Sequence, residues 1–268
     1  MAITALHSAA SGLSALSTQL DVISNNLANA NNNGFKSSRV EFEDLIYQYK
    51  QQPGVTNNNN DISPTGIAVG LGTRVSGTAV DFTQGSLVQT GNQYDVAIQG
   101  DGFFRVKTLS TQGDGLAYTR TGHFFRDLNG DLVLNSGDGF KLDPPVNVPA
   151  NATGITISSD GRVYATVSGT TAPTQLASIQ LVQFRNEQGL AQAGGNLYTQ
   201  TVASGPPTLG TPGTNGLGTL QQAAQETSNV DPVNELVNLI KTQRTFEMNS
   251  QSIQAADQML QTVGNLRR

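Results

Sequence analysis

Both ends of this chain carry apolar side chains that repeat every seven residues, and this spacing limits the folds open to it. Near the start, leucines recur at heptad intervals, with further apolar residues between them on the same face. The stripe consists of Leu6, Ala9, Leu13, Leu16, Leu20, Ile23 and Leu27. Alternating steps of three and four residues are typical of a coiled-coil seam. We therefore predict a helix over residues 3–29, roughly 40 Å long, that packs against other helices.

The C-terminal segment repeats this pattern. Asp231 and Pro232 provide a helix N-cap followed by proline at the first helical position. The residues seven apart are Leu239, Phe246, Ile253 and Leu260, and further apolar residues widen the stripe. We predict a second long amphipathic helix, which pairs with the first and with the equivalent helices of neighbouring subunits.

A helical stripe at this spacing can also belong to an ordinary protein core. Three features favour assembly instead: both helices are long, both are terminal, and the first 34 residues contain only His7 and Asp21 as ionisable side chains. The polar Thr242 and Asn249 in the second stripe also favour a specified helix register. We therefore expect these helices to form contacts between subunits.

Between the helices, β-branched and aromatic residues alternate with polar ones, as in half-buried strands. The clearest runs are Thr73–Val80, Tyr94–Ile98, Phe103–Lys107, Ile155–Ile157, Val163–Val167 and Ile179–Phe184. Turns rich in glycine and aspartate or asparagine separate them. The fold class we predict is mixed: long terminal coiled-coil helices packed together, and an all-β middle.

These patterns divide the chain into five segments. We expect an N-terminal helix in residues 1–33, an intermediate extended or β segment in 34–72, a β-rich outer domain in 73–204, a linker that returns to the intermediate segment in 205–227, and a C-terminal helix in 228–268. Two low-complexity stretches, Asn57–Asn60 and Gly205–Gly218, support loops or linkers.

Composition narrows the possible partners and compartments. Charged residues make up 13% of the chain, about half the ~25% of an ordinary soluble domain. Such a weakly charged surface favours self-association, and the net charge of −5 argues against nucleic acid as a partner. The chain has no cysteine, and no Lys or Arg precedes Lys36, so we expect no disulfide, no secretory signal peptide and no membrane insertion.

No motif in the sequence predicts a catalytic, cofactor or metal site. Residues Asp127–Asp131 resemble the start of a calcium loop, but the glycine is misplaced and the bidentate glutamate is missing, which favours a β-turn. The glycine pairs at 70–72 and 100–102 lack the spacing of a phosphate-binding loop and are interpreted as turns. Neither His7 nor His123 is paired with a nucleophile by any motif, so we interpret both as structural or surface residues.

Two longer motifs are more specific. The segment Ser11–Lys36 resembles the N-terminal signature of bacterial flagellar rod and hook proteins, and Ser228–Leu260 resembles their C-terminal signature. The matching residues are Asn25, Asn26, Leu27, Asn29, Gly34, Phe35 and Lys36 at one end, and Ser228, Asn229, Val230, Arg244 and Asn249 at the other. Motifs in the middle of the chain are most similar to the distal-rod members, so the resemblance covers essentially the whole chain. Asn32-Asn33 departs from the family pattern, and Asn57–Asn60 belongs to no motif that we can place.

The resemblance implies a structural subunit of the distal rod, without cofactor or enzymatic activity. Such a subunit assembles with copies of itself into a hollow helical drive shaft, whose inner layer the two helices would form. The implied partners are proximal-rod and hook-side proteins, the surrounding ring bushings and the type III export apparatus. The implied location is the flagellar basal body, from the periplasm to the outer membrane. The alternatives are another rod or hook subunit, a secreted β-rich fibre or adhesin, and an enzyme.

Overall fold

A computed structural model describes residues 2–54, 65–108, 115–167 and 172–266. The chain forms two compact units. The first comprises Met1–Ala28, Ser38–Ala79 and Asp231–Arg268, and the second comprises Asn29–Ser37 and Val80–Val230. The backbone therefore passes between the units four times along the sequence. The run Asn57–Asn60 lies outside the described residues.

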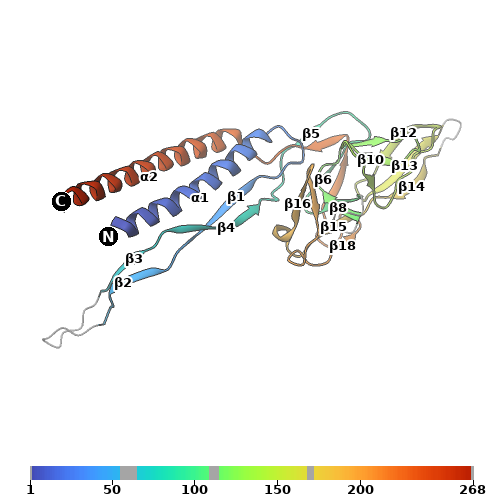
Figure 1. Cartoon of the computed structure of the whole chain (residues 1–268). Coiled ribbons are helices and arrows are strands. Elements are labelled where there is room, and N and C mark those ends of the chain that lie inside the picture. Colours follow the sequence, from blue (N-terminus) through green and yellow to red (C-terminus); the bar gives the residue numbers. More distant parts are fainter. Residues whose placement is uncertain (1, 55–64, 109–114, 168–171, 267–268) are drawn as a thin grey trace. The chain divides into compact units, whose positions relative to one another are not determined.

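The first unit contains both predicted terminal helices. Helix α1 spans Ala2–Ala28 and helix α2 spans Pro232–Leu266. The two helices lie side by side and antiparallel (Figure 1). The side chain of Asp231 caps α2, because its Oδ1 accepts hydrogen bonds from the backbone N–H groups of Val233 (3.0 Å) and Asn234 (3.3 Å). The structure thus confirms two terminal helices and the predicted N-cap.

Four strands of the first unit form two ribbons of two strands each. Strand β1 (Ser38–Asp44) pairs with β4 (Thr73–Val80), and β2 (Tyr47–Gln51) pairs antiparallel with β3 (Ile67–Gly70). Strand β1 also packs against α1. Every residue of β2 is exposed, so this end of the ribbon contributes little to the core.

The second unit is β-rich, as its alternating sequence pattern predicts. Its strands are β5 (Leu87–Gln89), β6 (Val96–Gln99), β7 (Phe103–Lys107), β8 (Leu116–Thr119), β9 (Phe124–Arg126), β10 (Leu132–Leu134), β11 (Lys141–Leu142), β12 (Ala152–Ile157), β13 (Arg162–Val167), β14 (Thr174–Ser178), β15 (Leu181–Gln183), β16 (Ala191–Gly194), β17 (Leu197–Thr199), β18 (Thr208–Gly210), β19 (Thr219–Gln222) and β20 (Ala224–Glu226). A short 3-10 helix, η2, spans Glu187–Gly189. The predicted run Phe103–Lys107 coincides with β7. The predicted run Thr73–Val80 coincides with β4 of the first unit.

The largest sheet has nine strands. Its main path runs β16-β17-β8-β7-β11-β10-β9, and β15 joins it through β7 and carries β18 on its other edge. Strands β12, β13 and β14 form a three-stranded antiparallel sheet, while β19 pairs with β6 and β20 with β5. Residues 205–227, which we expect to be a linker, therefore contain three strands that pair with β15, β6 and β5.

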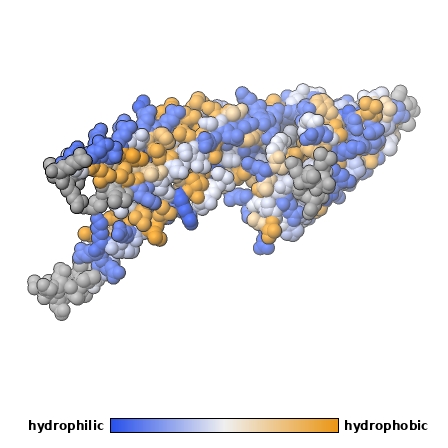
Figure 2. Space-filling view, in the orientation of Figure 1, coloured by the Kyte–Doolittle hydropathy of each residue, from blue (hydrophilic) through white to orange (hydrophobic). Residues whose placement is uncertain are grey.

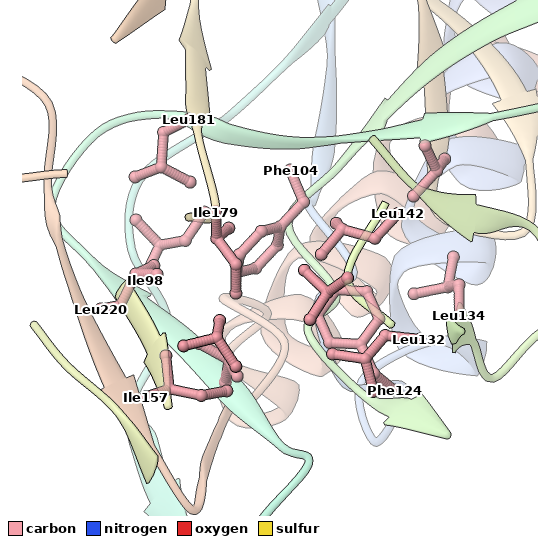
Figure 3. Packing of buried hydrophobic residues seen from close by; sticks show 14 of the residues in the cluster. Ile98, Phe104, Phe124, Leu132, Leu134, Leu142, Ile157, Ile179, Leu181 and Leu220 are labelled. Carbon is pink, nitrogen blue, oxygen red and sulfur yellow. The ribbon is translucent and has the colours of Figure 1, made fainter. Parts of the chain in front are cut away.

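Inward-facing side chains of these sheets form the hydrophobic core (Figure 3). Phe104 and Phe124 meet edge to face with ring centroids 5.4 Å apart, an arrangement favoured by aromatic quadrupoles. A smaller cluster gathers around Phe103, Tyr118 and Tyr198. Because both clusters lie within the second unit, this unit has a core of its own.

The glycine-containing segments form turns. At the tip of the β9–β10 hairpin, the Gly130 N–H donates to the Asp127 carbonyl at 2.9 Å, and Gly130 has φ +89°. Asp131 accepts a hydrogen bond from Lys141 Nζ at 2.8 Å. This geometry confirms the predicted β-turn at Asp127–Asp131.

Candidate assembly interface and the three-segment clamp

Two contacts between α1 and α2 involve small or polar residues of α1, Gly12 and Asn26. A Cβ added to Gly12 would lie 3.3 Å from Asn249 Nδ2, so glycine lets the helices come close. Two heptads further along α1, Asn26 Nδ2 lies 3.4 Å from Glu235 Oε1 of α2. From the first contact to the second, the position rises by fourteen residues on α1 and falls by fourteen on α2. The two contacts therefore define one antiparallel register of the helix pair.

The heptad stripes occupy this interface unevenly. In α1 the most buried side chains are Ala15, Ile23 and Asn26. Half-buried positions are Leu6, Leu13, Leu16, Leu20 and Leu27 of α1 and Leu239, Phe246 and Ile253 of α2, whereas Leu260 is exposed. The polar Thr242 is buried on the α1-facing side of α2, and its hydroxyl donates to the Asn238 carbonyl at 2.8 Å. The half-buried leucines of α1 therefore keep a minor part of their surface accessible within the first unit.

The first two turns of α2 expose a second apolar surface, which we call the outer face of α2. It consists of Val233, Leu236, Val237 and Ile240, with 69%, 47%, 43% and 56% of their surface accessible. At 3.6 residues per turn, these positions lie on the side of α2 away from the seam with α1. Figure 2 shows apolar residues at the surface of the helices. Contiguous exposed apolar surface of this kind marks interaction sites.

Within the first unit, Asn26 ties three chain segments together. Its Oδ1 accepts the Ser38 N–H at 2.9 Å and its Nδ2 donates to the Ser38 carbonyl at 2.8 Å, so the side chain pairs with the start of β1 as a neighbouring strand would. Burial raises the pKa of the Glu235 carboxyl, and the hydrogen bond from the Asn26 amide opposes this rise. Asn26 thus connects the end of α1 to the start of β1 and of α2.

In the second unit, Lys36 and Glu226 form a buried ion pair. Lys36 Nζ lies 2.6 Å from Glu226 Oε1 and donates to the Thr83 carbonyl at 2.6 Å. Both side chains have almost no accessible surface. The Gly85 N–H donates to the same carboxylate oxygen at 2.9 Å. Burial lowers the pKa of Lys36, and the neighbouring Glu226 carboxylate only partly offsets this effect.

Asn229 completes the arrangement, which we call the three-segment clamp and define as residues 34–37, 81–86 and 225–229. Its Oδ1 accepts the Ser37 N–H at 2.8 Å, and its Nδ2 donates to the Asp81 carbonyl at 2.8 Å. The Asp81 N–H in turn donates to the Ser37 carbonyl at 2.8 Å. One asparagine therefore holds the backbone of two other segments in place.

Gly34 lies where only glycine fits. Its φ is +75°, its N–H donates to the Glu226 carbonyl at 2.8 Å, and a Cβ would collide with Thr121. The turn that precedes it includes the unusual Asn32-Asn33 pair: the Phe35 N–H donates to the Asn32 carbonyl at 3.1 Å, and Asn33 Nδ2 donates to Gln225 Oε1 at 2.6 Å.

Of the other motif residues, Ser228 lies within the third clamp segment, whereas Asn25, Asn29 and Arg244 lie outside the clamp. Asn25 is exposed at the end of α1, and the Asn29 carbonyl accepts the Asn32 N–H at 3.0 Å. Ser228 Oγ accepts the N–H of the buried Val230 at 3.2 Å. Arg244 is exposed on α2, and its guanidinium lies 3.3 Å from Glu247.

Glu226 belongs to none of the sequence motifs, whereas Thr83 and Arg120 lie within the rod-like motifs in the middle of the chain, where no site was predicted. The guanidinium of Arg120, itself buried, lies 4.0 Å from Glu226 Oε2 and donates to the Gly100 carbonyl at 2.7 Å. Two features of the sequence could have pointed to this ion pair. They are an acidic residue two positions before the Ser228-Asn229 motif and a lysine at the end of the N-terminal motif. Their pairing could not be predicted, because 190 residues separate them.

His123, the histidine of the β-rich region, has a structural environment. Its Nδ1 lies 2.6 Å from the buried Asp95 carboxylate, which also accepts hydrogen bonds from Thr90, Asn92 and Gln225. Within the described ranges no three acidic or histidine side chains gather in an arrangement that could hold a metal ion. Neither α1 nor α2, the two long helices of the described chain, is apolar enough along its length to cross a bilayer.

Three segments match known family models. Residues 6–36 match the flagella basal body rod protein family, residues 97–165 match the D1 domain of flagellar hook protein FlgE/F/G, and residues 221–266 match the C-terminal domain of flagellar basal body rod FlgEFG proteins. The clamp residues Gly34, Lys36 and Asn229 fall inside the two terminal matches.

Several full-length relatives carry the name flagellar basal-body rod protein FlgG. The chain is 46% identical to flagellar basal-body rod protein FlgG of Buchnera aphidicola subsp. Acyrthosiphon pisum over 265 residues, covering 98% of this chain and 100% of the relative. It is 43% identical to FlgG of Caulobacter vibrioides over 264 residues, covering 98% and 99%, and 37% identical to FlgG of Bacillus subtilis over 274 residues, covering 99% and 100%.

Proposed function

Since the chain belongs to the flagellar basal-body rod protein family, it is a structural subunit of the distal rod and not an enzyme, and we propose that it polymerises there through its helix pair. The secreted fibre, adhesin and enzyme alternatives are set aside, because rod relatives span the whole chain. The role of such a subunit is mechanical, so the surfaces that join it to its neighbours decide how it carries load.

The exposed apolar surface of the first unit carries this proposal. The outer face of α2 and the half-buried leucines of α1 belong to different helices, so we propose them as two unlike surfaces for contacts with neighbours. Contacts between unlike surfaces that do not close into a ring generate a helical polymer. Burying four aliphatic side chains supplies a favourable term for each contact, because apolar surface leaves water.

We propose a finer architecture on the same grounds. The helices form coiled-coil seams, with each other and between subunits, and make up the inner layer of the tube. The first helix has few charges, so it would contribute a neutral polar lining. In this architecture, residues 1–33 and 228–268 form the inner helical layer, residues 34–72 form the intermediate segment, and residues 73–204 form the outer β-rich domain. Residues 205–227 return the chain to the intermediate segment.

The three-segment clamp serves the transmission of torque in this proposal. It holds residues that lead into three of the four passages between the units, at positions 37, 80 and 230. A buried ion pair and buried backbone hydrogen bonds resist deformation, because breaking either leaves an unpaired buried polar group. A load on one unit would therefore reach the other through backbone segments held in fixed positions.

The wider setting comes from the family resemblance. We propose that the subunit contacts proximal-rod and hook-side proteins and the ring bushings, that it reaches the basal body through the flagellar type III export apparatus, and that it is part of the rod, which runs from the periplasm to the outer membrane.

Electron microscopy of the concentrated full-length protein tests the polymerisation surface. The double variant Leu236→Asp and Ile240→Asp places two charges on the outer face of α2, at positions that are exposed and hence not needed for the fold of the subunit. We expect tubes from the unmodified chain and dispersed subunits from this variant.

A matched control carries the same two charges elsewhere on α2. Gln254 and Gln258 are exposed and also four residues apart, so Gln254→Asp with Gln258→Asp changes charge but removes no apolar surface. Tubes from this control and not from the Leu236/Ile240 variant would support the proposal. Tubes from both variants would show that the outer face of α2 is not a subunit contact.

A further inference from the structure

The sequence contains three Asn-Gly steps, Asn33-Gly34, Asn129-Gly130 and Asn215-Gly216. At such a step the glycine nitrogen can attack the side-chain amide carbon of the preceding asparagine, because glycine has no side chain to obstruct the approach. Whether it does so depends on how the fold holds both groups. The three steps differ in this respect.

The first two steps are restrained. At Gly34 the N–H donates to the Glu226 carbonyl at 2.8 Å, and the Asn33 amide donates to Gln225 at 2.6 Å. At Gly130 the N–H donates to the Asp127 carbonyl at 2.9 Å, and the residue is buried. In both cases the attacking nitrogen must first lose a hydrogen bond and move out of a packed position.

The third step is open. Asn215 and Gly216 have φ values of +54° and +82° and form the centre of a turn closed by the Leu217 N–H and the Thr214 carbonyl at 2.9 Å. Both residues are exposed, and no atom lies within 4 Å of a Cβ placed on Gly216. Among the residues that the structure describes, neither the Gly216 N–H nor the Asn215 amide has a hydrogen-bond partner.

We propose that Asn215 is a site of spontaneous deamidation in the folded protein. The Gly216 nitrogen bonds to the Asn215 side-chain carbonyl carbon, the bond from that carbon to the amide nitrogen breaks, and ammonia leaves with the proton from Gly216. A succinimide ring results. Water then adds to either ring carbonyl and opens the ring, which gives aspartate or isoaspartate at position 215.

The product changes the turn in two ways. A negative charge replaces a neutral amide, and isoaspartate adds a methylene to the main chain. The nearby Leu217 has 7% of its surface exposed and lies against Gly102 and Gly210. A longer main chain at position 215 would displace this buried side chain, so the modification would reach the core of the second unit.

Peptide mapping tests the proposal on the folded full-length chain. After incubation in mildly alkaline buffer, rapid digestion with trypsin places the three steps in separate peptides, 1–36, 127–141 and 186–241. Tandem mass spectrometry then locates the deamidated residue in each. We expect position 215 to react at least about tenfold faster than 33 or 129, since the loss of one buried hydrogen bond corresponds to about this factor.

Two controls separate local chemistry from restraint by the fold. In concentrated urea the three steps should react at similar rates, and Asn215→Gln should remove the fast reaction while the other two steps stay unchanged. The proposal is overturned if position 33 or 129 reacts as fast as 215 in the folded chain. It is equally overturned if 215 remains faster by the same factor in urea.

Discussion

At the scale of single residues, buried polar side chains decide how the terminal segments are held. Lys36 and Glu226 lie out of water, where each charge costs several kcal/mol to desolvate and depends on the other for compensation. Asn229 uses one amide to satisfy backbone groups of two other segments. The family motifs thus contain residues whose role is to satisfy specific buried partners.

Lys36→Met tests the ion pair. Methionine fills a similar volume but leaves the Glu226 carboxylate buried beside the Gly85 N–H and an Arg120 guanidinium 4.0 Å away. We expect the free energy of unfolding to fall by about 3–5 kcal/mol. Urea unfolding followed by circular dichroism measures this loss.

The double variant Lys36→Met with Glu226→Gln removes the uncompensated charge as well. It should recover part of the lost stability, because a neutral amide costs less to bury than a carboxylate. A double variant less stable than Lys36→Met would contradict the proposed role of the ion pair in the clamp.

The Asp131 carboxyl makes the free energy of unfolding depend on pH. Hydrogen bonds from Lys141 and then Asn147 lower the pKa of its carboxyl below the ordinary 3.8. A group whose pKa is depressed by folding stabilises the fold above its unfolded pKa, and this contribution is lost as the pH falls through the lower, folded value. Asp131→Asn should therefore be less stable than the unmodified chain at neutral pH and equally stable in strong acid.

Urea midpoints measured across this pH range provide the comparison. Lys141→Met should reproduce the part of this pH-dependent loss that comes from Lys141, and the combined variant should lose no more than Asp131→Asn alone, because Asp131→Asn already removes that interaction. A stability difference that persists unchanged in strong acid would show that the carboxylate is not its cause.

At the scale of elements, helices and strands with regular patterns form where the sequence predicts them. Helices α1 and α2 follow the heptad stripes, and β4 and β7 coincide with alternating runs. The short strands β18 to β20 lie in a segment rich in Gly, Pro, Thr and Gln, where no period is visible. They form because β15, β6 and β5 offer unpaired backbone groups to them.

Asn26→Ala tests how α1 is joined to β1. The change removes the hydrogen bonds that the Asn26 side chain makes with the backbone N–H and the backbone carbonyl of Ser38. With a penalty of about 1–3 kcal/mol for an unsatisfied buried group, the amide of Ser38 should exchange at least about tenfold faster. Hydrogen exchange with peptide-level mass spectrometry measures this.

A neighbouring substitution serves as the control. Ser24 is exposed on α1, and its hydroxyl donates only to the Leu20 carbonyl of its own helix, at 2.7 Å. Ser24→Ala should leave exchange at the start of β1 unchanged. If Ser24→Ala and Asn26→Ala accelerated this exchange equally, the effect would reflect general loosening of α1.

At the scale of the whole molecule, low charge and exposed apolar surface act in the same direction. Because the chain carries few charges, neighbouring subunits repel one another only weakly. In the proposed polymer, burying the outer face of α2 lowers the free energy, since apolar surface leaves water. The buried clamp lies within the second unit, and we propose that it helps the subunit bear load.

The forces that drive assembly can be separated by solution conditions. If apolar burial dominates, raising the NaCl concentration about tenfold should not dissolve the tubes, since salt screens only exposed charges. Cooling should weaken assembly, because hydrophobic stabilisation decreases at low temperature. Sedimentation of polymer from soluble subunits measures both effects, and tubes that dissolve at high salt would point to ion pairs as the main contact.

The sequence by itself determined the local, periodic features and the family. Heptad spacing selected the helices, alternation selected many of the strands, and the paired terminal motifs identified a rod and hook protein, because each signal lies within a short stretch of chain. It also indicated that Gly34, Lys36 and Asn229 matter, without saying what they touch.

Only the tertiary structure decided the partners of these residues. Lys36 meets Glu226 across 190 residues, Asn26 pairs with the backbone of Ser38, and Gly12 rather than a leucine marks the close approach of the helices. Such contacts depend on how distant segments pack, and no local pattern encodes them. The three Asn-Gly steps divide in the same way: the dipeptide is visible in the sequence, but the hydrogen bond that restrains two of them exists only in the folded chain.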